Sequence, residues 1–97
     1  MEEDSGIILS GNNWLVYILE CSDSSLYTGI TTNIDRRINQ HNSKKGAKYT
    51  KNRTPVKLVY LKDGFDRSSA LKEEYRIKKL SRKEKLLLIK LNSEKAI

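Results

Sequence analysis

The chain has 97 residues, of which 37% are hydrophobic and 32% charged, so it suits one small domain with a modest core. Nineteen Lys and Arg residues against twelve Asp and Glu residues give a formal net charge of +7, which favours polyanionic partners such as nucleic acid. A single cysteine, Cys21, and a single histidine, His41, exclude an intramolecular disulfide and the usual Cys/His zinc sites.

The segment 1–13 has no hydrophobic periodicity, and we expect it to be a flexible N-terminal arm. It is acidic and polar, without a basic stretch or a long apolar run, so it predicts neither export nor a membrane span. A cytoplasmic location is therefore expected. We place the folded domain at 14–92 and a frayed C-terminus at 93–97.

Two apolar runs, 14–21 and 26–31, predict neighbouring antiparallel strands joined by a polar turn. The first is almost continuously apolar, as is typical of a strand covered on both faces. The runs carry one tyrosine each, Tyr17 and Tyr27. These phenols share a face of the sheet only if the turn has an odd number of residues, for instance a turn over 22–26.

A short amphipathic helix follows the second strand, with Ile34 and Ile38 as its apolar stripe. At about 100° per residue, Arg37 and His41 lie within about 60° of Ile34, whereas Arg36 lies about 200° away. We therefore expect Arg37 and His41 to flank the core while Arg36 faces water. Because they are i,i+4 neighbours, Arg37 and His41 are expected to offer two donors to one anion.

The segment 43–53 is predicted to be a loop that contains at most one helical turn. Basic side chains surround an aromatic ring there, a pattern that suits backbone phosphates and a base to stack on. The expected nucleic-acid contacts are Lys44, Lys45, Lys48, Tyr49, Lys51 and Arg53. A solvated lysine-rich loop explains the same composition equally well.

Pro55 opens a third predicted strand over 56–62, which ends at Asp63-Gly64. Asp66 caps a longer helix that runs to about Leu80. A capping box that begins at Ser81 starts a last helix, which is expected to cover the sheet. The packing and rim positions of that helix are Leu86, Leu87, Ile89, Lys90 and Leu91.

The helix after Asp66 carries a carboxylate in the middle of its predicted apolar arc. On the helical wheel this arc consists of Ala70, Leu71, Tyr75 and Ile77, with Glu74 among them. A carboxylate in that place is costly unless it has a partner. Glu74 therefore either pairs with Lys78 or a nearby hydroxyl, or it ligates a metal ion.

The spacing of Tyr17, Tyr27-Thr28-Gly29, Arg37 and His41 resembles the signature of the GIY-YIG nuclease superfamily. The runs 26–32, 46–50 and 70–78 are similar to its small stand-alone bacterial branch, whose cellular role is largely unassigned. The likeness covers 14–90. It implies a single α/β (α+β) domain in which a three-stranded antiparallel sheet is flanked by helices.

The resemblance also implies a divalent-metal-dependent DNA endonuclease that hydrolyses phosphodiester bonds, structure-selective in DNA repair or recombination. DNA is the implied substrate, with RNA as a second candidate and a partner protein or dimer as a source of specificity. Glu74 corresponds to the metal ligand, for weakly bound Mg²⁺ or Mn²⁺. Arg37 would grip the non-bridging phosphate oxygens, and Tyr27 would act as general base on water. Tyr17 and His41 would position water or phosphate, or share the base role.

The sequence departs from the family pattern in four places, one of which is that no asparagine clearly matches the one that some members use near the metal. The first motif, 15–17, lacks the family's glycine, Thr28 replaces isoleucine, and Ile30 stands where some members have a lysine. An alternative is therefore a non-catalytic nucleic-acid-binding module that retains the GIY-YIG fold. A third hypothesis, which depends on charge alone, is a basic accessory protein bound to RNA or another protein.

Overall fold

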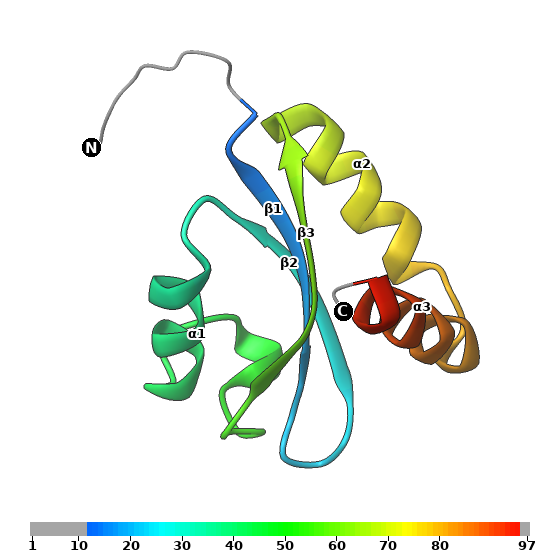
Figure 1. Cartoon of the computed structure of the whole chain (residues 1–97). Coiled ribbons are helices and arrows are strands. Elements are labelled where there is room, and N and C mark those ends of the chain that lie inside the picture. The colour runs from blue at the N-terminus through cyan, green and yellow to red at the C-terminus, as the bar shows by residue number, and fades with distance from the viewer. Residues whose placement is uncertain (1–11, 96–97) are drawn as a thin grey trace.

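The computed structural model describes residues 12–95, which form a sheet with helices on both faces (Figure 1). The strands are β1 (Trp14–Glu20), β2 (Leu26–Thr31) and β3 (Lys57–Phe65), in the order β2-β1-β3. The helices are α1 (Ile34–Asn42), the short 3₁₀ turn η2 (Lys48–Thr50), α2 (Arg67–Lys78) and α3 (Arg82–Lys95). All strand pairs are antiparallel, so the expected α+β architecture is confirmed. Residues 1–11 of the expected N-terminal arm lie outside the described residues.

The central strand β1 has two buried faces because helices cover both sides of the sheet. Val16 and Ile18 face α2 and α3, and they pack with Tyr60 in one hydrophobic cluster. Tyr17 and Leu19 face the other way, toward α1. This arrangement explains why the sequence of β1 is apolar throughout rather than alternating.

The turn between β1 and β2 covers 21–25, which is an odd number of residues. The strands pair Leu19 with Tyr27 and Tyr17 with Gly29, so the phenols of Tyr17 and Tyr27 lie on the same face. The turn is one residue earlier than the 22–26 of our example, but its odd length has the predicted consequence.

Strand β3 is longer than predicted, because it continues through Asp63-Gly64 to Phe65. Gly64 has a φ of +86°, a conformation that a side chain would strain. The register between β1 and β3 shifts near this end, and Phe65 pairs with Trp14. A glycine that was expected to end the strand instead lies within an irregular stretch of it.

The buried stripe of α2 differs from the predicted arc. Ala70 and Ile77 are fully buried, as expected, but Leu71 and Tyr75 are 39% and 62% exposed. Glu73 and Glu74 are half-buried between Ala70 and Ile77, at the i+3 and i+4 positions of the stripe. The prediction for Leu71 and Tyr75 was wrong because the helix turns its two carboxylates toward the sheet instead.

Helix α3 begins with the predicted capping box, in which Ser81 and Glu84 exchange backbone-to-side-chain hydrogen bonds. Its core contacts come from Leu88 and Ile89. The expected packing of Leu86, Leu87 and Leu91 was wrong, since these side chains are exposed. Residues 93–95, expected to be frayed, continue the helix. No helix within residues 12–95 is long and apolar enough to cross a membrane.

Candidate active site on the Tyr17 face

The ring of Tyr17 lies across the edge strand β2, directly above Gly29. A Cβ atom added at Gly29 would lie 2.5 Å from the Tyr17 hydroxyl oxygen and 2.7 Å from Cζ. No other residue type leaves this space, so the glycine of the second motif is explained by close approach rather than by backbone conformation. The Tyr17 hydroxyl therefore sits over the edge of the sheet.

Two side chains of α1 meet at this hydroxyl. Arg37 Nε donates to the Tyr17 oxygen at 3.3 Å, and His41 Nε2 lies 3.1 Å from the same oxygen. Arg36, one residue before Arg37, is exposed. The helical periodicity thus correctly separated the two arginines, and Asn33 fixes the start of the helix by accepting a hydrogen bond from the Arg36 backbone.

His41 is fully buried, and both of its ring nitrogens have partners. In addition to the contact with Tyr17, Nδ1 lies 2.7 Å from Thr50 Oγ1. The prediction that Arg37 and His41 offer two donors to one anion was therefore wrong. Arg37 alone can do so, because its bonds to Tyr17 and to Gln40 Oε1 (3.1 Å) leave further N–H donors of the guanidinium.

Tyr27 connects this cluster to the basic loop. Its ring centroid lies 6.4 Å from that of Tyr17 and 5.3 Å from that of His41, and it stacks on Tyr49 at 5.8 Å. The guanidinium of Arg53 lies 4.1 Å from the centroid of Tyr49. Tyr49 therefore already has two partners, and a nucleic-acid base that stacks on it competes with Arg53.

The cations of the loop fall into two groups. Arg53 is held in place, because its Nε pairs with Asp23 Oδ2 at 3.0 Å and its Nη1 donates to the Tyr49 carbonyl. The other four are exposed: Lys44, Lys45, Lys48 and Lys51. The lysines are therefore accessible to a phosphate backbone, whereas Arg53 would first have to break its ion pair with Asp23.

Glu74 lies on α2, the helix that packs against β2 and β1. Its side chain is 18% exposed, and Oε2 lies 3.2 Å from Lys78 Nζ, so the ion-pair alternative describes this structure. The negative charge of Glu74 also contributes to raising the pKa of Tyr17. The Glu74 carboxylate is therefore close enough to influence the Tyr17 hydroxyl electrostatically, although α2 and α1 lie on opposite faces of the sheet.

The donor set fits a weakly held divalent ion. Among the side chains of residues 12–93, no three His, Cys, Asp or Glu groups lie around a common point. Mg²⁺ commonly takes one or two carboxylates and completes its shell with water and substrate phosphate. Glu74 offers one partly buried carboxylate beside a half-exposed lysine that can swing away. The residues thus suit an ion that arrives with the substrate.

Burial raises the pKa of Tyr17, and the charges of Tyr27 and Glu74 act in the same direction, while the hydrogen bond from Arg37 opposes them. For Arg37, partial burial disfavours the charged form, but hydrogen bonds to the two phenols outweigh it and leave its pKa raised. The site therefore holds a permanent cation against a phenol that stays protonated at neutral pH.

Burial, together with the charge of Arg37, lowers the pKa of His41 from 6.5 to about 4. Between these values the unfolded chain binds a proton that the folded chain does not. We predict that the free energy of unfolding falls as the pH drops from about 6.5 to about 4, by up to about 3 kcal/mol.

Urea unfolding at a series of pH values measures this effect, and an NMR titration of the single histidine reads the pKa directly. The same series on His41→Leu is the control, and it should lack this component. A His41 that titrates near 6.5 in the folded protein would contradict the prediction.

Sequence reasoning assigned no role to Thr50 or Gly46, although both belong to the run that resembles the family. Thr50 is fully buried against His41, and a Cβ at Gly46 would lie 2.5 Å from His41 Nδ1. The available signal was the resemblance itself. The contact across the loop depends on the fold, and no periodicity encodes it.

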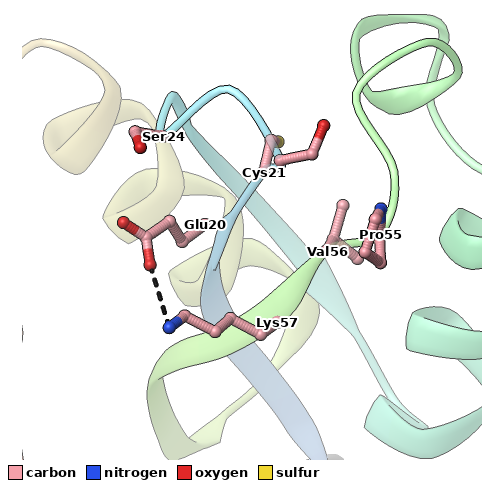
Figure 2. Close-up of a pocket in the computed structure, with 7 residues that line it drawn as sticks. Glu20, Cys21, Ser24, Pro55, Val56 and Lys57 are labelled. Atoms are coloured by element: carbon pink, nitrogen blue, oxygen red, sulfur yellow. Dashed lines mark ion pairs between the residues drawn. The ribbon is translucent and has the colours of Figure 1, made fainter.

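A pocket of about 430 Å³ lies elsewhere, beside the β1–β2 turn (Figure 2). Its lining includes Cys21, Val56 and the ion pair between Glu20 and Lys57, at 3.4 Å. Burial raises the pKa of the Cys21 thiol, which suits a protonated, unreactive side chain. None of the predicted catalytic residues lines this pocket.

Comparisons with known proteins show the family of the chain. The sequence profile of the GIY-YIG catalytic domain matches residues 13–87. A UPF0213 protein of Syntrophus aciditrophicus is 62% identical over 81 residues, which are 82% of this chain and 93% of that protein. A UPF0213 protein of Oceanobacillus iheyensis is 51% identical over 81% of this chain and 92% of its own length.

The solution NMR structure of the UPF0213 protein BH0048 from Bacillus halodurans is similar in fold, with a TM-score of 0.53 and 50% identity. The match covers 80% of this chain and 83% of that one. Both the sequence and the sheet with its flanking helices are thus shared over most of the chain. The protein accordingly belongs to the GIY-YIG family of nuclease-type catalytic domains, among the small UPF0213 proteins.

Proposed function

We propose that this protein is a divalent-metal-dependent endonuclease domain that hydrolyses phosphodiester bonds in DNA. The observation that carries the proposal is the meeting of Arg37 with the hydroxyl of Tyr17, beside Tyr27 and next to the four exposed lysines of the loop. A guanidinium on a rigid helix, next to phenols and accessible cations, suits a phosphate group better than a neutral ligand.

In this proposal Arg37 binds the non-bridging oxygens of the scissile phosphate and stabilises the charge that develops there. Glu74 holds the ion, which would polarise the phosphate and favour ionisation of water. Tyr27, in the form that has released its own hydroxyl proton to solvent, takes the proton from the attacking water, and the P–O bond on the side opposite the attack breaks. Tyr17 is less suited to that role, because burial raises its pKa and its oxygen already serves Arg37 and His41.

A panel of labelled branched, flapped, nicked, single-stranded and duplex DNAs with Mg²⁺ or Mn²⁺ tests the activity and its selectivity. Preferential cutting of branched or flapped DNA would support a role in repair or recombination. If the wild-type protein cuts none of these substrates above the level of a Glu74→Ala preparation, the endonuclease proposal fails.

The second candidate is a binding module that retains the fold without turnover. It is favoured by Ile30 in the place of a lysine and by the pairing of Glu74 with Lys78. Both candidates need the loop lysines to meet phosphates, but only the first needs a metal ion. Binding that persists without cleavage at any Mg²⁺ or Mn²⁺ concentration would select the module.

Replacing Lys44, Lys45 and Lys48 by glutamine is expected to weaken DNA binding and to flatten its dependence on salt. Each phosphate contact that is lost lowers the slope of log K against log [salt] by about 0.9 for duplex DNA. Fluorescence anisotropy at several NaCl concentrations measures the slope. The matched control removes equal charge from α2 and α3, with Lys72, Lys83 and Lys90 changed to glutamine. An equal loss of slope in both triple variants would contradict a binding surface on the loop.

A further inference from the structure

A continuous row of hydrogen bonds runs from Arg37 through the core to the loop. Arg37 Nε lies 3.3 Å from the Tyr17 oxygen, which lies 3.1 Å from His41 Nε2. His41 Nδ1 lies 2.7 Å from Thr50 Oγ1, which donates to the Ala47 carbonyl at 3.0 Å. Tyr17, His41 and Thr50 are all at most 1% exposed, so bulk solvent does not reach these three side chains.

The groups at the two ends of this row of hydrogen bonds determine which atom donates in each bond. A carbonyl oxygen only accepts, so the single hydroxyl proton of Thr50 points to Ala47. The Thr50 oxygen must then accept from His41, which places the proton of the neutral imidazole on Nδ1. Nε2 is left as an acceptor for the hydroxyl proton of Tyr17, and the Tyr17 oxygen keeps its lone pairs for Arg37.

The opposite tautomer breaks the hydrogen bond from the Thr50 hydroxyl to the Ala47 carbonyl, which keeps the Thr50 backbone N–H as a donor at 3.1 Å, and it leaves the hydroxyl proton of Tyr17 unsatisfied. With the proton on Nε2, Thr50 would have to donate to Nδ1, and no hydrogen would lie between its oxygen and the Ala47 carbonyl. The hydroxyl proton of Tyr17 would also lose its acceptor, in a place where the side chain is 1% exposed. That proton would turn toward Arg37 and compete with its Nε–H.

We propose that Thr50 is a positioning residue of the site: it selects the Nδ1–H tautomer of His41 and so aims the Tyr17 oxygen at Arg37. Thr50 follows Lys48 in the same 3₁₀ turn, so the loop that offers lysines to DNA also sets the proton arrangement behind Arg37. The effect on cleavage rests on the proposed function, whereas the tautomer does not.

The chain's single histidine makes the test direct. Long-range ¹H–¹⁵N NMR of the full chain at pH 7, without DNA or metal, reports which ring nitrogen carries the proton. Wild type and Thr50→Ser should show Nδ1–H alone, and in Thr50→Val, which keeps the shape but not the hydroxyl, a fraction of Nε2–H should appear, because only the Tyr17 hydroxyl proton still favours Nδ1–H. In Thr50→Val the Nε–H of Arg37 should also exchange faster with solvent.

A second variant separates the two neighbours of His41. Tyr17→Phe should leave the Nδ1–H tautomer unchanged, because the Thr50 oxygen still accepts from Nδ1 when the hydroxyl proton of Tyr17 is absent. An Nε2–H tautomer in the wild type, or a tautomer that changes in Tyr17→Phe, overturns the proposal whether or not Thr50→Val folds.

If DNA cleavage is established, Thr50→Val should lower the single-turnover rate by about 10- to 100-fold. This is the range for residues that act by hydrogen-bonding to a functional side chain and fixing its orientation. Thr50→Ser should restore most of the rate. Wild-type protein that shows the Nδ1–H tautomer but no cleavage would contradict the proposed function and leave the positioning role of Thr50 supported. Cleavage by the wild type, together with an unchanged tautomer in Thr50→Val, would support the proposed function and contradict the positioning role of Thr50.

Discussion

Replacing Arg37 by alanine is expected to lower the single-turnover rate of DNA cleavage by about 10² to 10³, the cost of removing one preorganised donor from a developing charge. The Arg37 guanidinium is a permanent cation that is hydrogen-bonded to the Tyr17 hydroxyl. The measurement is cleavage at saturating protein with Mg²⁺, beside thermal unfolding to show that the variant is folded. Arg37→Lys should recover little, because an ammonium lacks the planar fork that reaches phosphate and Tyr17 together.

The neighbouring arginine provides a matched control. Arg36→Ala removes the same charge one residue away, but Arg36 is exposed and faces away from the cluster. Its cleavage rate should stay within a few-fold of wild type at moderate salt, because only long-range attraction is lost. Equal losses in the Arg36 and Arg37 variants would mean that net charge, and not the site, determines activity.

Replacing Glu74 by glutamine should lower metal-dependent cleavage by about 10²-fold or more, because the amide keeps the shape but loses the charge that holds the ion. The measurement is the rate as a function of Mg²⁺ concentration. The stability should change little, since the Lys78 side chain that loses its partner is 50% exposed.

Glu73 is the matched control for this variant. It precedes Glu74 on the same helix and is equally half-buried, but both of its oxygens bind Arg76, at 2.9 and 2.6 Å. Glu73→Gln should lose up to about 1 kcal/mol of stability and keep its response to Mg²⁺. A Glu74→Gln protein that cuts at the wild-type rate across the Mg²⁺ range would remove Glu74 from the chemistry.

Local periodicity was sufficient to predict which side chains of β1, β2 and α1 face the site. The 3.6-residue repeat of α1 distinguished the partly buried Arg37 from the exposed Arg36. The two-residue repeat of the strands meant that the phenols share a face of the sheet if the turn between the strands has an odd number of residues. Both rules hold because side-chain direction in a regular element follows from backbone geometry alone.

The same rule was less reliable on α2, where the apolar arc was assumed to face the sheet. Leu71 and Tyr75 are exposed, while Glu73 and Glu74 are half-buried and each has a basic partner. A carboxylate neutralised by an arginine or lysine one turn along the helix can line a packed face, because the pair reduces the cost of burial. The rotation of such a helix depends on its partners and not on its apolar residues alone.

By itself, the sequence predicted the strands and helices, made the common face of Tyr17 and Tyr27 depend on the length of one turn, and indicated the family to which the chain belongs. Only the tertiary structure decided that His41 is buried between Tyr17 and Thr50, that Glu74 pairs with Lys78, and that Arg53 is held by Asp23. The physical reason is the range of the interactions. Element type and face depend on neighbours within one turn or one strand, whereas hydrogen bonds between elements exist only after the loops have brought distant residues together.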